Sequence, residues 1–327
     1  MTYSSTGLIQ ASDYNGFAST TVSGNVNATW NTTYGQTALS TVSTSGTVTA
    51  TQWSTLFSTI ASMSTHQGTA ITSRIPYPAT GNVIYANANV ATDIQSCYTN
   101  RYNANVIGAQ FTGWTGTASK TTATGSGGAA WTITFTDTIT FANATAASNF
   151  FGCGGYLQVQ FGKSSTGTVA DTEWNAFIGA AGAGGVVAAK VILTSDATSK
   201  TIVGVTYLGT YKTGGTGTPT TLATGTGYNQ LTGTPATIYK QFDAGAAYSS
   251  NYVQINASQA SGVITLTTTW FDAGDANPGS TAQISGGTAT TGISFGTAPT
   301  TIVTAYTPET TNISNTWGSY SIASTVA

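Results

Sequence analysis

Charged side chains are scarce in this sequence. It has 8 Lys and Arg and 10 Asp and Glu, which is 6% of 327 residues, whereas about 25% is usual in soluble domains. Nucleic-acid binding draws most of its affinity from clustered cations that neutralise phosphates. The basic residues here are scattered along the chain: Arg74, Arg101, Lys120, Lys163, Lys190, Lys200, Lys212 and Lys240. The sequence therefore predicts no nucleic-acid partner.

The sequence also has no long apolar run, and its first residues do not predict a signal peptide. Its most apolar stretch, Gly179 to Leu193, consists mostly of Gly and Ala and contains Lys190, so it predicts no membrane span. The first residues, Met-Thr-Tyr-Ser-Ser-Thr-Gly-Leu, have neither a basic start nor an apolar run. We therefore expect synthesis in a cytoplasm without export through a signal peptide.

Cysteine and histidine, which commonly bind metals or act in catalysis, are rare. Cys97 and Cys153 have no metal-ligand spacing, and we expect two buried thiols because the expected compartment is reducing. A Ser-His-Asp triad would have to use His66, the single histidine, which has no acidic neighbour in the sequence. The sequence therefore predicts no triad, no metal site and no cofactor.

Two pairs of acidic residues are the other candidates for catalysis. Asp171 and Glu173 begin a predicted helix, where free amides and the helix dipole favour acidic side chains. Asp272 and Asp275 lie at a Gly-Asn-Pro turn, and two carboxylates without an Asp-rich repeat make a weak calcium site. A paired-carboxylate hydrolase would need one of these pairs. We interpret both pairs as structural, so we expect no catalytic residue and no enzyme.

Thr, Ser, Gly, Ala and Asn take the place of the charged residues. Thr is β-branched, which favours strand over helix at exposed positions. Hydrophobic residues make up 40% of the chain and include 7 Trp and 16 Tyr, which is enough for a core. The composition therefore predicts a mainly β protein.

The apolar spacing predicts three helices. Thr49 and Gln52 have the arrangement of a capping box before an apolar stripe. The stripe consists of Trp53, Leu56, Phe57, Ile60 and Met63. Asn143 is a good N-cap for a short helix that Gly152 ends, and a second short capped helix is predicted over Asp171 to Gly179.

Strand patterns recur at short intervals in the second part of the chain. Trp131–Phe141 alternates apolar residues with Thr, and Tyr156–Phe161 alternates them with Gln. Further candidates are Val186 to Leu193, Thr201 to Leu208, Thr237 to Phe242, Asn251 to Ala257, Gly262 to Phe271, Thr290 to Phe295, Thr300 to Tyr306 and Trp317 to Ser324. So many short strands predict a β-sandwich over residues 130–327, with the two short helices covering an end or a face.

The first part of the chain has another character. Residues 1–112 combine the Trp53 helix with irregular segments, and Val83 to Tyr98 fits either a second helix or a pair of strands. Arg101 is expected to bind backbone carbonyls or Asp93. Residues 113–129 are almost wholly Thr, Ser, Gly and Ala, which predicts a linker or a long exposed loop. We therefore expect a smaller α+β domain, this linker, and then the β-sandwich domain.

Several short pieces of the sequence, in their order and spacing, resemble a family of virion structural proteins. The pieces are Thr-Tyr-Gly-Gln36, Val-Thr-Ala-Thr-Gln-Trp53, His-Gln67, Thr-Asn-Arg-Tyr-Asn103, Asn-Phe-Phe-Gly-Cys-Gly-Gly155, Thr-Glu-Trp174 and Tyr-Ser-Ser-Asn-Tyr252. This family is encoded by tailed phages of marine cyanobacteria and other aquatic bacteria, and the similarity covers nearly the whole chain. Gln158 and Gln160 depart from it, since a basic residue is expected in that strand.

The resemblance implies a non-enzymatic virion protein, expected in a fibre attached to the tail or the capsid. It supplies no catalytic residue. The expected partners are other virion proteins and further copies of this chain, because few charges protect its strand edges. A trimer is favoured, since closed symmetry would leave no edge free and the resemblance implies a fibre, which in tailed phages is commonly trimeric. A capsid decoration protein is the alternative among structural proteins. A carbohydrate-binding module for host recognition, whose exposed Trp and Tyr stack on surface polysaccharide, is the alternative from another class.

Overall fold

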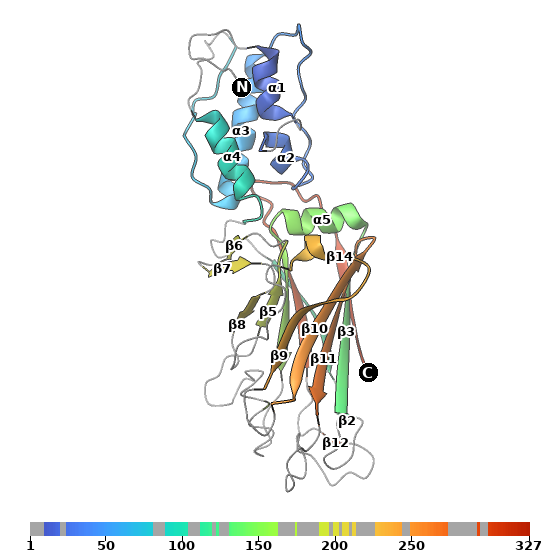
Figure 1. Cartoon of the computed structure of the whole chain (residues 1–327). Coiled ribbons are helices and arrows are strands. Elements are labelled where there is room, and N and C mark those ends of the chain that lie inside the picture. The colour runs from blue at the N-terminus through green and yellow to red at the C-terminus, as the bar shows by residue number, and fades with distance from the viewer. Residues whose placement is uncertain are drawn as a thin grey trace.

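The protein has a group of helices at one end and two β-sheets at the other (Figure 1). The structure is a computed structural model that describes residues 10–19, 24–80, 89–103, 112–119, 122–123, 131–162, 174, 190–195, 199–202, 205–208, 211–213, 226–243, 249–273, 293–294 and 300–327. The chain is mainly β, as its composition predicts.

Four helices, which we call the head, precede the sheets. They are α1 (Ala11–Ala18), α2 (Val26–Trp30), α3 (Ala50–Gln67) and α4 (Val90–Thr99). The capping box predicted for α3 is present: the Thr49 hydroxyl accepts from Gln52 N at 3.2 Å, and Thr49 N donates to Gln52 Oε1 at 2.8 Å. Gly68, at φ 66°, ends α3 in the left-handed conformation that favours glycine.

Trp53 on α3 is the centre of the head. Its side chain is 1% exposed, and its ring lies 5.9 Å from Tyr14, 6.1 Å from Phe17 and 5.4 Å from Phe57, between ring centroids. The apolar stripe predicted from the sequence therefore packs in the protein's own core.

The α+β organisation predicted for residues 1–112 is wrong for the part that the structure describes. Residues 10–19, 24–80 and 89–103 contain the four helices and no strand. Of the segment Val83 to Tyr98, for which a helix and a pair of strands both fitted, residues 83–88 lie outside the described residues. In α4, Val90, Ile94 and Cys97 are buried at steps of four and three, so one face of this helix packs on the other head helices.

The strands form two antiparallel five-stranded sheets. The first sheet has the order β1 (Thr112–Ser119), β13 (Thr300–Thr307), β4 (Tyr156–Gly162), β5 (Lys190–Leu193) and β8 (Tyr211–Thr213). The second has the order β14 (Tyr320–Val326), β3 (Trp131–Phe141), β11 (Val263–Asp272), β10 (Tyr252–Ala260) and β9 (Ala236–Phe242). Two small pairs join β2 (Thr122–Ala123) to β12 (Ile293–Ser294) and β6 (Ser199–Ile202) to β7 (Val205–Leu208).

The two sheets contact each other through inward-facing aromatic side chains. Phe161 of β4 lies 6.1 Å from Trp270 of β11 and 6.2 Å from Tyr239 of β9, between ring centroids. Trp174, the one described residue of the helix predicted over 171–179, is buried and stacks on Trp270 at 5.7 Å. The period-two pattern read from the sequence therefore marks the core face of these strands.

The linker predicted over residues 113–129 is wrong where the structure describes that segment. Residues 112–119 form β1 and pair along their whole length with β13, and Thr122–Ala123 pairs with β12. The uncharged, Thr-rich composition that suggested a loop also favours strand once a neighbouring strand supplies hydrogen bonds. Residues 120–121 and 124–130 lie outside the described residues.

The other predicted strands differ from the structure mainly in detail. The bounds of β3 are those predicted, while the single strand expected over Thr201 to Leu208 is the β6–β7 pair. Of the candidate Val186 to Leu193, Lys190–Leu193 is described as β5, and β8 was not expected. These strands are short, and the alternation of apolar residues predicts that a segment is a strand better than it predicts where the strand begins and ends.

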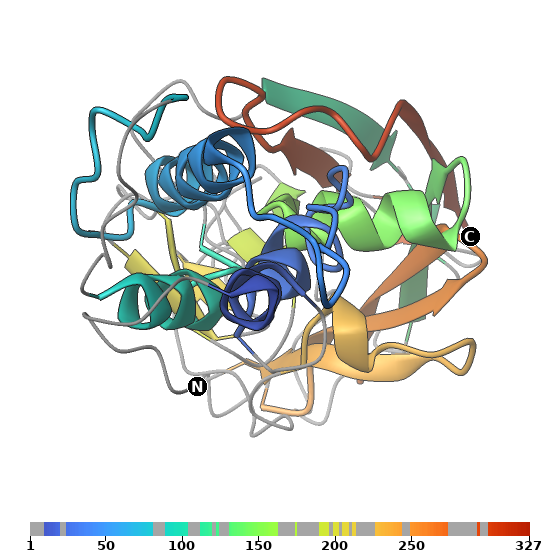
Figure 2. The same ribbon diagram turned by 90° about the horizontal axis from the view of Figure 1, so that it is seen from above.

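Helix α5 (Ala144–Gly152) lies between the head and the sheets (Figure 1). The predicted N-cap is confirmed, since the Asn143 side chain accepts from Ala146 N at 2.9 Å. In the view from above, the head helices lie over the end of the sheets and α5 lies beside them (Figure 2). The C-terminal end of this helix makes some of the polar contacts described next.

Candidate functional site

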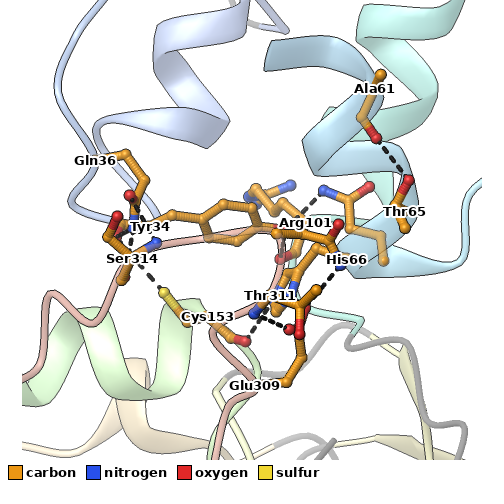
Figure 3. Close-up of polar contacts among 12 residues, drawn as sticks. Tyr34, Gln36, Ala61, Thr65, His66, Arg101, Cys153, Glu309, Thr311 and Ser314 are labelled. Atoms are coloured by element: carbon orange, nitrogen blue, oxygen red, sulfur yellow. Dashed lines mark hydrogen bonds and ion pairs between the residues drawn. The ribbon is translucent and has the colours of Figure 1, made fainter. Parts of the chain in front are cut away.

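Buried polar contacts join the head to the rest of the protein (Figure 3). We call this set of contacts the joint. Its members come from three parts of the chain: Tyr34, Gln36, His66, Gln67 and Arg101 of the head, Asn149, Gly152 and Cys153 at the end of α5, and residues 309–316 between β13 and β14.

His66, at the end of α3, is the centre of the joint and is 0% exposed. Its Nδ1 lies 3.0 Å from Glu309 Oε1, and its Nε2 lies 2.8 Å from the Cys153 carbonyl oxygen. A carbonyl and a carboxylate oxygen both accept hydrogen bonds, so each ring nitrogen has to supply a proton. The geometry therefore suits a charged imidazolium paired with the Glu309 carboxylate.

Glu309 is held by three donors. Burial raises its pKa, but hydrogen bonds from His66, from Asn312 Nδ2 at 3.1 Å and from Thr311 N outweigh this and lower the pKa to about 2. The carboxylate is therefore ionised at neutral pH and complements the His66 ring.

Tyr34 bonds on both sides of the joint. Its hydroxyl donates to Arg101 O at 2.7 Å and accepts from Gln67 Nε2 at 2.7 Å. Its carbonyl accepts from Thr316 Oγ1 at 2.6 Å and from Cys153 Sγ at 3.5 Å. Burial raises the pKa of Tyr34 well above its usual value, so the hydroxyl remains a neutral donor.

The side-chain amide of Gln36 makes two hydrogen bonds with the backbone of Ser314, which lies between β13 and β14. Its Nε2 donates to Ser314 O at 2.8 Å, and Ser314 N donates to its Oε1 at 3.1 Å. A Cβ at Gly152 would lie 2.1 Å from Thr33 O, and one at Gly35 would lie 2.2 Å from Asn149 Nδ2. Glycine at these two positions lets the head and α5 approach this closely.

The structure gives His66 an acidic partner that its sequence neighbourhood lacks, since Glu309 is 243 residues away. Both ring nitrogens are bonded and the ring is buried, so this pair is built to hold the joint. Cys97 and Cys153 are buried thiols that form no disulfide, as predicted. Burial raises the pKa of the Cys97 thiol to about 12, which leaves it uncharged and unreactive.

The remaining predicted candidates are structural or fall outside the described residues. Asp171, Glu173 and Asp275 belong to the latter group. Asp272 is buried, and its Oδ2 accepts from Trp174 Nε1 at 3.3 Å and from Asn251 Nδ2 at 3.2 Å. In the described part of the chain, no three His, Cys, Asp or Glu side chains gather as metal ligands. No described helix is both long enough and apolar enough to span a membrane.

Arg101 was expected to bind backbone carbonyls or Asp93, and the structure shows the first of these. Its Nη1 donates to Tyr98 O at 2.7 Å, and its guanidinium lies over the Tyr98 and Tyr102 rings. Asp93 pairs instead with Arg74.

A buried acid in the second sheet has no counterpart in the sequence predictions. Asp137 belongs to the inward row of β3 and is 0% exposed. Its Oδ1 accepts from Ser324 Oγ, and its Oδ2 has no hydrogen-bond partner among the described residues. Burial raises the pKa of Asp137 to about 6 although the Ser324 bond lowers it. The sequence did contain a signal for this buried acid, because Asp137 interrupts the alternation of apolar residues in Trp131–Phe141.

A second candidate site lies on the outward face of the second sheet. Phe242 of β9, Tyr252 of β10 and Phe271 of β11 are opposite one another in the strand register, and we call them the aromatic row. Tyr252 stacks on Phe271 at 4.8 Å, and Phe242 meets Tyr252 edge-on at 5.6 Å. The Lys240 ammonium lies 3.9 Å from the Tyr252 ring centroid and 4.8 Å from that of Phe242. This arrangement presents aromatic rings and one cation together.

Comparison of the chain with protein-family models, with curated proteins and with solved structures finds no match.

Proposed function

We propose that this chain is a non-enzymatic structural protein of a phage virion and forms part of a fibre attached to the tail or the capsid. The observation that supports this beyond the sequence resemblance is the joint. It uses the chain's single histidine to fix the head to the sheets. Such a molecule suits a role in which one end attaches and the other is displayed.

The partners in this proposal are other virion proteins and further copies of the chain. The strand β14 (Tyr-Ser-Ile-Ala-Ser-Thr-Val) is the last strand of its sheet and contains no charged residue and no Pro. Native edge strands usually carry such residues to prevent pairing with another chain. A neighbouring subunit is the simplest cover for this edge, and closed symmetry would cover it in every copy.

Immuno-electron microscopy of virions labelled with antibody against this chain tests the proposal. Label on fibres that project from the particle is the expected result. Label spread over the capsid surface would favour the decoration protein instead, and particles without label would contradict a virion location.

A carbohydrate-binding module for host recognition is the second candidate, and the aromatic row favours it. Aromatic rings at a wet surface can stack on the apolar faces of sugars while polar neighbours bind hydroxyl groups. This activity is compatible with a fibre, because a fibre that reaches the host needs a binding face.

A further inference from the structure

The outward face of the second sheet is almost free of charge. Its outward positions hold mainly hydroxyl and amide side chains: Thr132, Thr134, Thr136, Thr138 and Thr140 of β3, Thr265, Thr267 and Thr269 of β11, Gln254, Asn256 and Ser258 of β10, Thr237 of β9, and Ser321 and Thr325 of β14. Among the outward positions of these five described strands, Lys240 is the one charged side chain. A ligand for this face therefore has to suit neutral hydrogen-bonding groups.

The aromatic row interrupts this hydroxyl face, and its three rings are not part of the buried core. The inward positions of the same strands, such as Trp270 and Ile255, already fill the space between the sheets. Phe242 is 37% exposed, and Tyr252 and Phe271 are half-buried. Three adjacent rings at a surface present a small apolar area with a defined shape, which is a common feature of binding sites.

Amide and hydroxyl groups next to the row are already ordered. Gln254 Nε2 and Thr237 Oγ1 both donate to Asn256 Oδ1, at 2.9 and 2.8 Å. Gln254 lies opposite Lys240 in the register, one outward position from Tyr252. From Tyr252 to Asn256 the strand extends roughly 14 Å, since each residue rises about 3.4 Å. The row and the amide groups therefore form one continuous surface that can contact more than one sugar ring.

This combination fits a glycan better than a protein or a nucleic acid. A stable protein interface needs about 800 Å² on each side with an apolar centre, whereas three rings here are surrounded by hydroxyl and amide groups. Nucleic acid would need several cations. Sugars offer apolar C–H faces for the rings and hydroxyl groups for the amides. The Lys240 ammonium, held over Tyr252, adds a site for one anionic group.

We propose that Phe242, Tyr252, Phe271 and Lys240 form a binding site for an acidic glycan, one that carries carboxylate or sulfate groups on its sugars. This inference rests on the second candidate function given above and adds the site and the ligand class. The rings stack on the sugars, the Gln254 and Asn256 amides bind hydroxyl groups, and Lys240 distinguishes acidic from neutral chains.

The test uses the full chain on an array of acidic and neutral glycans, followed by calorimetric titration with a polyuronate oligosaccharide and a neutral oligosaccharide of equal length. We expect selective binding of acidic glycans. Phe242→Ala should weaken binding of the polyuronate about tenfold or more, since it removes the most exposed ring. Lys240→Gln should abolish the preference for the acidic chain and its weakening by salt, while weak binding of the neutral chain remains.

Thr140→Ala is the matched control. Thr140 faces outward on the same sheet, but it lies at the end of β3 opposite to Thr132, which pairs with Phe271, so this substitution should leave the affinity unchanged. Circular dichroism and melting of each variant check that it is folded. No binding to any acidic glycan, or unchanged affinity in a folded Phe242→Ala variant, would overturn the site. The proposed site would also be overturned if the wild-type protein bound no glycan and Phe242→Ala instead abolished the binding of a protein partner.

The glycan test is independent of the virion proposal. Antibody label on fibres together with no glycan binding would leave the fibre proposal standing and refute this site. Selective glycan binding together with unlabelled particles would support the site and refute the virion location.

Discussion

At the scale of single residues, Glu309 should make stability sensitive to acid in a defined pH range. Its ordinary pKa is 4.5, and in the folded protein it is lowered to about 2. A lowered pKa means that the ionised form stabilises the fold, so this contribution is present above pH 4.5 and is lost as the pH falls through about 2. Glu309→Gln should therefore flatten the dependence of unfolding free energy on pH in this range.

At pH 7 the same replacement should cost about 1.5 to 3 kcal/mol, because His66 and Thr311 lose hydrogen bonds to a charged group. Urea unfolding between pH 2 and 7 measures both effects. Asn312→Ala removes one donor and leaves the charge, so its effect should be smaller. Equal acid sensitivity in wild type and Glu309→Gln would show that the His66 pair does not hold the joint.

Asp137 should act in the opposite direction. Its pKa is raised from 3.8 to about 6, so the folded state favours the protonated acid. Stability from this group is complete below about pH 3.8 and is lost as the pH rises through about 6, which amounts to about 3 kcal/mol at most. Asp137→Asn resembles the protonated acid at every pH. Its stability relative to wild type should therefore rise by about 2 to 3 kcal/mol between pH 4 and pH 8.

Denaturant unfolding at the two pH values measures this difference. Ser324→Ala is the matched comparison, since it removes the donor to Asp137 Oδ1 but keeps the carboxyl group, and it should steepen the loss of stability. A difference between Asp137→Asn and wild type that stays constant with pH would refute the buried-acid interpretation.

At the scale of elements, the sequence predicts helices and strands well where one local pattern decides them. The Thr49 capping box, the Asn143 cap and the alternation in Trp131–Phe141 all depend on neighbours within a few residues, and each gives the observed element. Strand β1 could not be found in this way. Its pairing with β13 joins Thr112 to Thr307, and no local spacing encodes a partner so far along the chain.

The candidate sites follow the same rule. The cap that begins the helix of His66 is local, and this helix was predicted. The contact between His66 and Glu309 was missed, because only the packing of the head on the sheets brings them together. The aromatic row was hidden for the same reason: its three residues come from three strands, and only their register places them side by side.

Gly152→Ala should disturb the docking of α5 against the head. The added Cβ would lie 2.1 Å from the backbone oxygen of Thr33, which cannot move without shifting the turn before Tyr34. Overpacking of this kind typically costs about 1 to 3 kcal/mol. Gly233→Ala is the control, because a Cβ there meets nothing within 4 Å. Thermal melting and limited proteolysis should show a loosened head in the first variant, and equal behaviour of both variants would refute the close approach.

At the scale of the whole molecule, the stability of the protein should respond little to salt. Within the described residues the ion pairs are His66–Glu309 and Arg74–Asp93, and their side chains are at most 8% exposed. Salt mainly screens exposed charges, whose pairs contribute about 1 kcal/mol or less. The melting temperature should therefore change by less than about 5 °C between low and high sodium chloride. A larger change that a second salt of different type reproduces would contradict this expectation.

The whole molecule should also self-associate along β14. The opposite edge of the second sheet has the features that prevent pairing, because β9 follows Pro235, carries Lys240 and has a register shift against β10. Strand β14 has none of these, and Ser321, Ala323 and Thr325 are exposed on it. An uncharged strand at a sheet edge tends to pair with another chain, and a closed trimer would leave no such edge free.

Light scattering across a dilution series measures this. A trimer corresponds to about 100 kDa, three times the 33.2 kDa of one chain. Ala323→Lys places a charge on the edge and should shift the protein to a monomer, because pairing would bring identical charges together. Thr140→Lys places the same charge on the outward face of β3, one strand further in, and should leave the trimer intact. Dissociation of both variants would argue for an interface over the sheet face. A wild-type protein that is a monomer at every concentration would refute self-assembly, and it would favour a decoration protein that is ordered on the capsid.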